Sequence, residues 1–111
     1  MASTPWKLHK FGGTSLADAS CFKQVAQILA RARDDSPGVN QGVVVSAMGG
    51  MTDQLLHLAV LAENDDDGFE GELQAIGKRY TETAKQLVSN SAFVDVLDAW
   101  SVDATVIQEQ L

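Results

Sequence analysis

Two segments of the chain each combine a short apolar run, a pair of glycines and a helix-like pattern, in that order. The first spans residues 6–15 and the second spans residues 42–52, with glycine pairs at 12–13 and 49–50. Strands that alternate with helices are typical of parallel α/β sheets. Parallel strands end at one edge of the sheet, and ligands bind outside that edge. The two glycine pairs are therefore expected to meet there and to form a cradle for an anion.

The rest of the pattern predicts an α/β protein with about two parallel strands and four helices. Residues 6–11 are expected to form one strand, and the valines at 43–45 a second strand that is buried on both faces, because polar alternation is missing. Asp18 and Thr52 are the expected N-caps of the first two helices. Apolar spacing of three and four residues predicts helices from about Asp18 to a turn at 34–38, from Thr52 to a loop at 63–68, from Phe69 to a break at 89–91, and from Phe93 onward.

The charge balance excludes several classes of partner. Fifteen acidic and eight basic residues give a formal net charge of -7, and such a surface repels nucleic-acid backbones and anionic lipid headgroups. The single cysteine, Cys21, excludes an intrachain disulfide and suits a reducing cytosol. No run approaches the roughly 20 apolar residues of a membrane span, and no signal-peptide pattern is present. A cytoplasmic protein without nucleic-acid or membrane partners is expected.

Lys10 is the candidate for binding phosphate oxygens. It ends the first strand directly before the glycines at 12–13, where bare backbone can approach a ligand and point N–H groups at it. Because the lysine precedes the glycines, the pattern is not a P-loop. A solvated lysine before an ordinary turn fits the spacing equally well. Thr14 and Ser15 either donate hydroxyl groups to the ligand or cap the first helix.

The other polar candidates favour simpler interpretations. The aspartates at 65–67 do not continue into the spacing of a metal-binding loop. His9 and His57 have no carboxylate or cysteine at metal spacing, so packed or surface histidines are favoured. Cys21 has no neighbour that would activate it. No metal held by protein side chains is expected.

Two motifs resemble those of the aspartate kinases, in the amino acid kinase superfamily. The first is KFGGTS at 10–15, and the second is VVSAMGGMTDQL at 44–55. In addition, LHK at 8–10 and LAD at 16–18 resemble the kinase half of bifunctional aspartokinase–homoserine dehydrogenases. The resemblance covers roughly residues 6–60 and is thin beyond them.

This resemblance implies a three-layer αβα amino acid kinase fold, with residues 1–111 as the N-terminal part of the catalytic domain. It implies transfer of the γ-phosphoryl group of ATP to the β-carboxylate of L-aspartate, at the head of lysine, threonine and methionine biosynthesis. A carboxylate is already a nucleophile, so catalysis reduces to positioning and charge stabilisation. The full-length enzyme is expected to be a homo-oligomer.

The resemblance also assigns roles to individual residues. Lys10 would stabilise the transferring phosphoryl group as the catalytic residue, and Mg²⁺ would be held through the ATP phosphates. The implied nucleotide-binding residues are Lys10, Gly12, Gly13 and Ser15, and the implied substrate-binding residues are Ser46 and Thr52.

A later Gly-Glu motif of the family has no match before Leu111. The chain is therefore expected to be a segment of a longer kinase and not to turn over alone. One alternative is another amino acid kinase, acting on a glutamate derivative, carbamate or a nucleotide. The KFGGTS run and Thr52 argue against it. A second alternative is a non-catalytic anion-binding or interaction module, which predicts cooperative unfolding and a monodisperse species.

Overall fold

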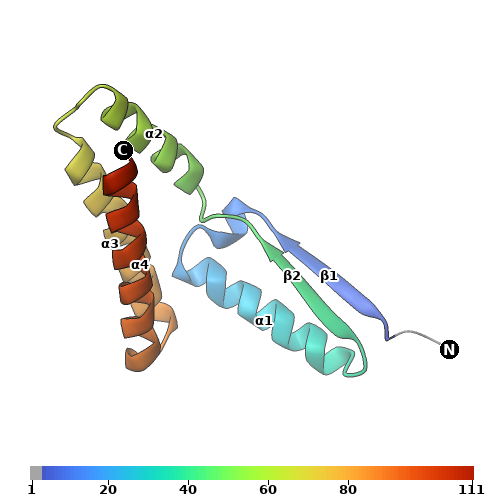
Figure 1. The fold of residues 1–111 in the computed structure, drawn as a ribbon. Helices are drawn as coiled ribbons and strands as arrows, with labels where there is room; N and C mark the ends of the chain where they lie inside the picture. The colour runs from blue at the N-terminus through green and yellow to red at the C-terminus, as the bar shows by residue number, and fades with distance from the viewer. Residues whose placement is uncertain (1–3) are drawn as a thin grey trace. The chain divides into compact units, whose positions relative to one another are not determined.

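A computed structural model describes residues 4–111, and the chain divides into two compact units, Met1–Gly50 and Met51–Leu111. The described residues form two strands and four α-helices, as predicted (Figure 1). In chain order the elements are β1 (Trp6–Phe11), the short 3-10 helix η1 (Gly13–Leu16), α1 (Ala19–Asp35), β2 (Asn40–Val45), α2 (Met51–Glu63), α3 (Phe69–Leu87) and α4 (Asn90–Gln110).

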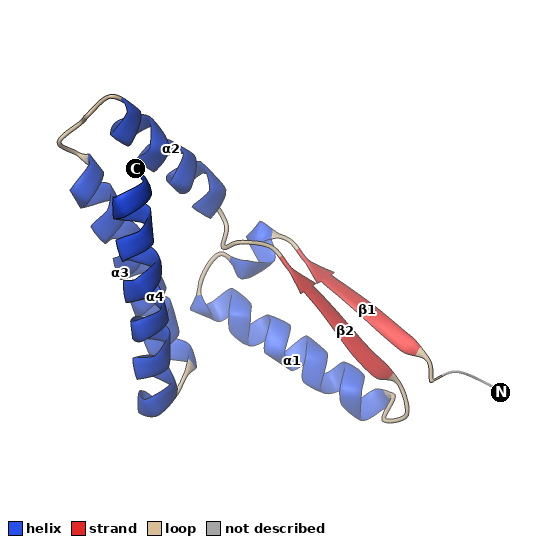
Figure 2. Ribbon diagram, in the orientation of Figure 1, coloured by secondary structure: helices blue, strands red, loops and turns tan. Residues whose placement is uncertain are grey.

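The first unit is a β–α–β arrangement. Strands β1 and β2 are parallel and pair in register from Trp6↔Asn40 to Phe11↔Val45, and α1 runs along the sheet (Figure 2). Side chains alternate between the two faces of a strand. His9 and Phe11 are half-buried, whereas Leu8 and Lys10 are exposed. Helix α1 therefore covers the His9 and Phe11 face, and Lys10 belongs to the opposite face.

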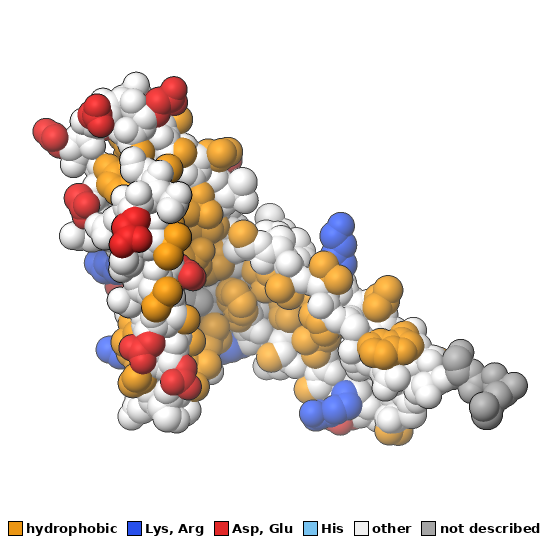
Figure 3. Space-filling model, in the orientation of Figure 1, with side chains coloured by type: hydrophobic (Ala, Val, Ile, Leu, Met, Phe, Trp, Pro, Cys, Tyr) orange, Lys and Arg blue, Asp and Glu red, His pale blue; other side chains and the backbone are white. Residues whose placement is uncertain are grey.

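The predicted burial of the β2 valines on both faces is wrong. Val43, Val44 and Val45 are 44%, 57% and 57% exposed, and Leu8 of β1 is 78% exposed. Figure 3 shows apolar side chains at the surface along these strands. Burial of both faces requires a second covering layer, and the first unit supplies a single α-helix. The unbroken run of valines thus correctly predicted a strand, but it did not predict which faces of that strand are covered by other elements.

The ends of α1 are set by local hydrogen bonds. Asp18 is the N-cap, as predicted, because its Oδ1 accepts a hydrogen bond of 2.9 Å from the N–H of Cys21. At the other end, the N–H of Ser36 donates to the carbonyl of Ala32. The prediction for Thr52 is wrong, since α2 begins at Met51. Thr52 therefore lies inside the first turn of α2 and is not its N-cap.

In the second unit, α3 packs against both α2 and α4. Arg79 of α3 donates to Oε1 of Gln54 in α2 over 2.8 Å. On the other side, Trp100 of α4 packs against Tyr80, with ring centroids 5.1 Å apart. Burial raises the pKa of the Tyr80 hydroxyl. This aromatic pair is thus one of the contacts that hold α3 and α4 together.

The second unit also carries the longest helices. α3 begins at Phe69, as predicted, while α4 begins at Asn90, inside the break predicted at 89–91. Within residues 4–111, no helix combines the length and apolar character needed to span a bilayer.

Gly77 of α3 is expected to be essential for the packing of α3 on α4. A Cβ at Gly77 would lie 2.5 Å from Nε1 and 3.1 Å from Cε2 of Trp100. We expect Gly77→Ala to destabilise the second unit by up to about 2 kcal/mol, since overpacking costs about 1–3 kcal/mol and a gain in helix propensity of about 1 kcal/mol offsets part of it. Urea unfolding followed by circular dichroism and tryptophan fluorescence measures the change.

Gly71→Ala is the matched control, because Gly71 lies in the same helix and has nothing within 4 Å of an added Cβ. It is expected to be neutral or to stabilise the protein by up to about 1 kcal/mol. Equal effects of the two substitutions would contradict the proposed packing role of Gly77.

The N-cap of α1 predicts a pH-dependent stability. The N–H of Cys21 lowers the pKa of Asp18 below its ordinary value of 3.8, so the cap stabilises the fold above that pH and is lost as the pH falls through the folded-state pKa. We expect Asp18→Ala to melt at a lower temperature than the wild type at pH 7, with a smaller difference near pH 3. Thermal unfolding by circular dichroism tests this.

Asp18→Asn is the control, because it keeps an acceptor oxygen, and it is expected to retain most of the stability at both pH values. If the melting temperature of Asp18→Ala differed from that of the wild type by the same amount at pH 7 and pH 3, the proposed role of the carboxylate would be disproved.

Candidate functional site

The two glycine pairs that follow β1 and β2 meet in the first unit. A Cβ built on Gly49 would lie 2.8 Å from the carbonyl oxygen of Gly13, and a Cβ built on Gly13 would lie 3.4 Å from Cα of Gly49. Beyond the paired strands, the N–H of Ser46 donates to the carbonyl of Phe11 over 3.1 Å. The two turns are thus in main-chain contact at the C-terminal edge of the sheet, where the sequence predicted them to meet.

The four glycines occupy their positions for different physical reasons. Gly50 has a φ of 77°, in the left-handed region that favours glycine. Gly13 and Gly49 approach each other too closely for a side chain on Gly49. Gly12 has extended backbone angles (φ -82°, ψ 180°) and nothing within 4 Å of an added Cβ. Neither its conformation nor its surroundings in the described chain therefore requires glycine at position 12.

The turn after β1 presents main-chain donors. The N–H of Ser15 donates to the carbonyl of Gly12 over 3.1 Å and closes η1. Within residues 4–111, the N–H groups of Gly13 and Thr14 make no hydrogen bond, as is usual for the first donors of a helical turn. Successive N–H groups of this kind form concavities that suit anions.

Lys10 lies two residues before Gly12, opposite Val44 on the sheet face that α1 does not cover. Its side chain is exposed. In the part of the chain that the structure describes, its ammonium group makes no ion pair or hydrogen bond. The lysine therefore supplies an uncompensated positive charge on the strand that leads into the glycine turn.

Ser46 lies beside the same turn. Its Oγ is 3.7 Å from the position of a Cβ on Gly13, and it donates to the carbonyl of Ala47 over 2.7 Å. The fold therefore brings Ser46 and Gly13 together, although they are far apart in the sequence. Ser15 is exposed in η1, and Thr52 is exposed in the first turn of α2, in the second unit.

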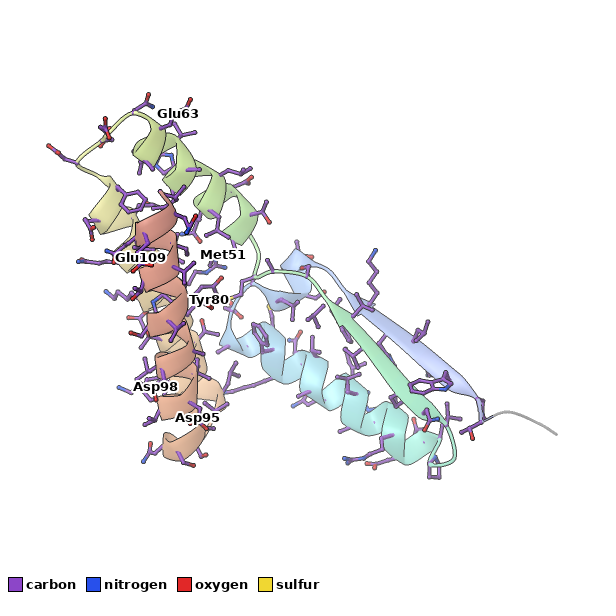
Figure 4. All side chains as sticks on the ribbon, viewed as in Figure 1. Met51, Glu63, Tyr80, Asp95, Asp98 and Glu109 are labelled. Carbon is purple, nitrogen blue, oxygen red and sulfur yellow. The ribbon has the colours of Figure 1, made fainter. Side chains whose placement is uncertain are left out.

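Charge is divided unevenly between the two units. Residues 1–50 contain five basic and three acidic residues, whereas residues 51–111 contain three basic and twelve acidic ones. Figure 4 shows Asp95, Asp98 and Glu109 on α4, within the acidic unit. The unit that carries the glycine turns is thus net positive, even though the chain as a whole has a charge of -7. This local balance favours an anion at the turns.

Two other polar features among the described residues are poor candidates for phosphate binding. His9 donates to Oε1 of Gln41 over 2.5 Å and stacks on Phe11, so it is a packed histidine. A cavity of about 440 Å³ in the second unit is lined in part by Glu70 and the aspartates at 65–67, and these carboxylates repel anions. Among residues 4–111, no group of three or more His, Cys, Asp or Glu is placed to hold a metal ion.

The candidate residues Lys10, Gly12, Gly13, Ser15 and Ser46 all belong to the first unit. The second glycine pair was expected to help form the cradle, but Gly49 and Gly50 received no individual role from the sequence. The sequence does contain a pattern that could have assigned them, because the second glycine pair follows β2 as the first pair follows β1. A pair of glycines in a turn does not reveal, however, that one member packs against another main chain.

Known proteins resemble this chain, two from plants over nearly its whole length and one bacterial protein over about half of it. A bifunctional aspartokinase/homoserine dehydrogenase from Daucus carota is 32% identical over 106 residues, which are 96% of this chain and 11% of that protein. A counterpart from Arabidopsis thaliana is 31% identical over the same extent. Bifunctional aspartokinase/homoserine dehydrogenase 2 from Escherichia coli (strain K12) is 42% identical over 59 residues, or 53% of this chain and 7% of that protein.

The chain therefore spans about a tenth of the length of these relatives. The amino acid kinase family matches residues 5–109, which include β1, β2 and both glycine turns. A match of this extent, over the elements that build the candidate site, shows that the chain belongs to the amino acid kinase family.

Proposed function

We propose that residues 1–111 are the N-terminal part of the catalytic domain of an ATP-dependent aspartate kinase. The observation that carries the proposal is the main-chain contact between Gly13 and Gly49, with Ser46 beside Gly13 and Lys10 on the strand that leads into the first turn. The positive charge of the first unit and the aspartokinase names of the relatives support it. The activity belongs to a longer polypeptide, because the relatives extend far beyond the matched region.

The reaction that fits this site is phosphoryl transfer to a carboxylate. A β-carboxylate oxygen of L-aspartate would form a bond to the γ-phosphorus of ATP. The bond from that phosphorus to the bridging oxygen would break, and ADP would keep the electron pair. The products would be 4-phospho-L-aspartate and ADP. No proton has to be removed from the acceptor, so the protein is required to position the reactants and to stabilise charge.

The residues of the first unit would act mainly on the phosphates. Lys10 would stabilise negative charge on the transferring phosphoryl oxygens, and the N–H groups at Gly12 and Gly13 would hold the phosphate chain. Ser15 would support this turn or contact the phosphates. Mg²⁺ would be held through the ATP phosphates and would neutralise part of their charge.

The acceptor would be held from the second turn. Ser46 and Thr52 carry hydroxyl groups before and after the second glycine pair, and we assign both to L-aspartate. This reaction would begin lysine, threonine and methionine biosynthesis. The single cysteine fits a reducing cytoplasm, and the acidic composition disfavours nucleic-acid partners. From the family resemblance, the full-length enzyme would be a homo-oligomer.

The test of this function is an ADP-release assay on the full-length protein that contains this segment. With ATP and L-aspartate, Lys10→Ala is expected to lower kcat by about 100- to 1,000-fold, as for removal of one preorganised charge-stabilising donor. The KM for ATP should rise much less, because the contact strengthens in the transition state.

Lys7→Ala is the matched control, because Lys7 is also an exposed lysine of β1 but lies three residues earlier. It is expected to leave kcat within about twofold. A near-normal kcat for Lys10→Ala would show that Lys10 is only a surface residue. Glutamate derivatives, carbamate and nucleotides are tested as acceptors in the same assay, and faster transfer to one of them would replace aspartate kinase with another activity of the family.

Gly12 offers a test that separates ligand binding from folding. Because Gly12 has ordinary backbone angles and open surroundings, Gly12→Ala is expected to leave the melting temperature unchanged or slightly raised. A methyl group there would hold phosphate oxygens away from the main chain. We expect Mg-ATP binding, measured by calorimetry on the full-length protein, to weaken by about tenfold or more, since a charge-assisted hydrogen bond contributes about 1.5–3 kcal/mol.

Gly38→Ala is the control for this substitution, because Gly38 also has nothing within 4 Å of an added Cβ. It lies in the turn before β2, at the opposite end of the strands. Unchanged Mg-ATP affinity in Gly12→Ala would place the phosphates away from this turn.

A further inference from the structure

We propose that Gly49 is a positioning residue that sets the spacing between the turn after β1 and the turn after β2. The inference rests on the proposed function and adds a residue to it. In this account Gly49 contacts neither ATP nor the acceptor. It acts through the main chain of Gly13, which carries a donor for the phosphates.

The geometry at Gly49 leaves no room for a side chain. A Cβ there would lie 2.8 Å from the carbonyl oxygen of Gly13, 3.4 Å from its carbonyl carbon and 3.3 Å from Cβ of Ala17. Two of these three neighbours are main-chain atoms, which cannot rotate away as a flexible side chain can. Even one methyl group would therefore push the two turns apart by several tenths of an ångström.

The other three glycines do not have this role. A Cβ added to Gly12 or Gly50 would have no neighbour within 4 Å. A Cβ added to Gly13 would have its closest neighbour at 3.4 Å, which is an ordinary van der Waals distance. Gly50 is constrained by its left-handed backbone instead. Among the four, Gly49 alone would clash directly with the main chain of the opposite turn.

The spacing of these turns matters because each carries part of the proposed machinery. The turn after β1 presents N–H groups of Gly13 and Thr14, and Ser46 belongs to the turn after β2. Transfer requires reacting atoms about 3–3.5 Å apart, and a misplacement of about 1 Å can cost about 100-fold in rate. A small separation of the turns would thus reduce turnover more than it reduces binding of either ligand.

The experiment compares Gly49→Ala with Gly38→Ala in the full-length protein. We expect Gly49→Ala to lower kcat by about 10- to 100-fold, with KM for ATP and for L-aspartate changed by less than about threefold, and with an unchanged circular dichroism spectrum. Gly38→Ala, outside the site, should keep wild-type kinetics. A wild-type kcat in Gly49→Ala would overturn the proposal, and so would a loss that lies entirely in KM.

Ala17→Val tests the same spacing if Gly49→Ala does not fold. Its added methyl groups approach Gly49 from the η1 side without adding an atom to either glycine pair, and a smaller fall in kcat with unchanged KM is expected. Unchanged kcat in this variant would also contradict the role of Gly49. The two proposals fail in different ways: a wild-type protein that does not phosphorylate L-aspartate refutes the assigned function, whereas an active wild type with equally active variants refutes only the positioning role.

Discussion

The main-chain contact between Gly13 and Gly49 determines how the candidate site is built. Because β1 and β2 are parallel and paired in register, the chain leaves both strands at one edge of the sheet. Glycine at both turns allows the two backbones to touch there. The position of Ser46 beside Gly13 then follows from the pairing of the strands. A site made in this way depends on backbone geometry more than on side-chain packing, which explains how it can form in a unit whose strands remain largely exposed.

The two units of the chain carry net charges of opposite sign, so the charge of the whole chain does not describe the surroundings of the candidate site. A net charge of -7 by itself disfavours an anion, yet the acidic excess lies entirely in residues 51–111. Exposed charges separated by more than about 8–10 Å are largely screened at physiological salt. The charges that decide phosphate binding are therefore those nearest to the turns, and Lys10 is uncompensated within the described residues. The overall composition argues against polyanionic partners, but it carries no information about a small anion held by a few local groups.

The features predicted correctly from the sequence were those set by neighbouring residues. Asp18 was identified as an N-cap because the side chain and the N–H that it accepts are three residues apart. The burial of Val43–Val45 was not predictable, since it depends on which elements cover the sheet. The start of α2 moved to Met51, next to the left-handed Gly50, a shift too small for apolar spacing to detect. The contact of Gly77 with Trp100 likewise depends on how two helices pair. Sequence patterns therefore indicated that the two turns meet, whereas the distances between them follow only from the three-dimensional structure.

The reasons for glycine at each turn position separate the requirements of the fold from those of a ligand. Gly50 is explained by its backbone angle and Gly49 by the carbonyl of Gly13. Within residues 4–111, Gly12 has neither explanation. Glycine also raises the entropy of the unfolded chain, which costs about 0.4–1 kcal/mol relative to alanine. Gly12 is thus a position at which the described fold tolerates a side chain. It lies between the strand that carries Lys10 and a turn whose first N–H groups are free, so a bound ligand is the explanation that we favour for glycine there. Close approach of phosphate oxygens to the backbone is the requirement that fits the charge of Lys10 and the donors of Gly13 and Thr14. The backbone angle of a turn glycine and the space around its missing Cβ therefore separate three roles: a conformational role, a packing role and contact with a ligand.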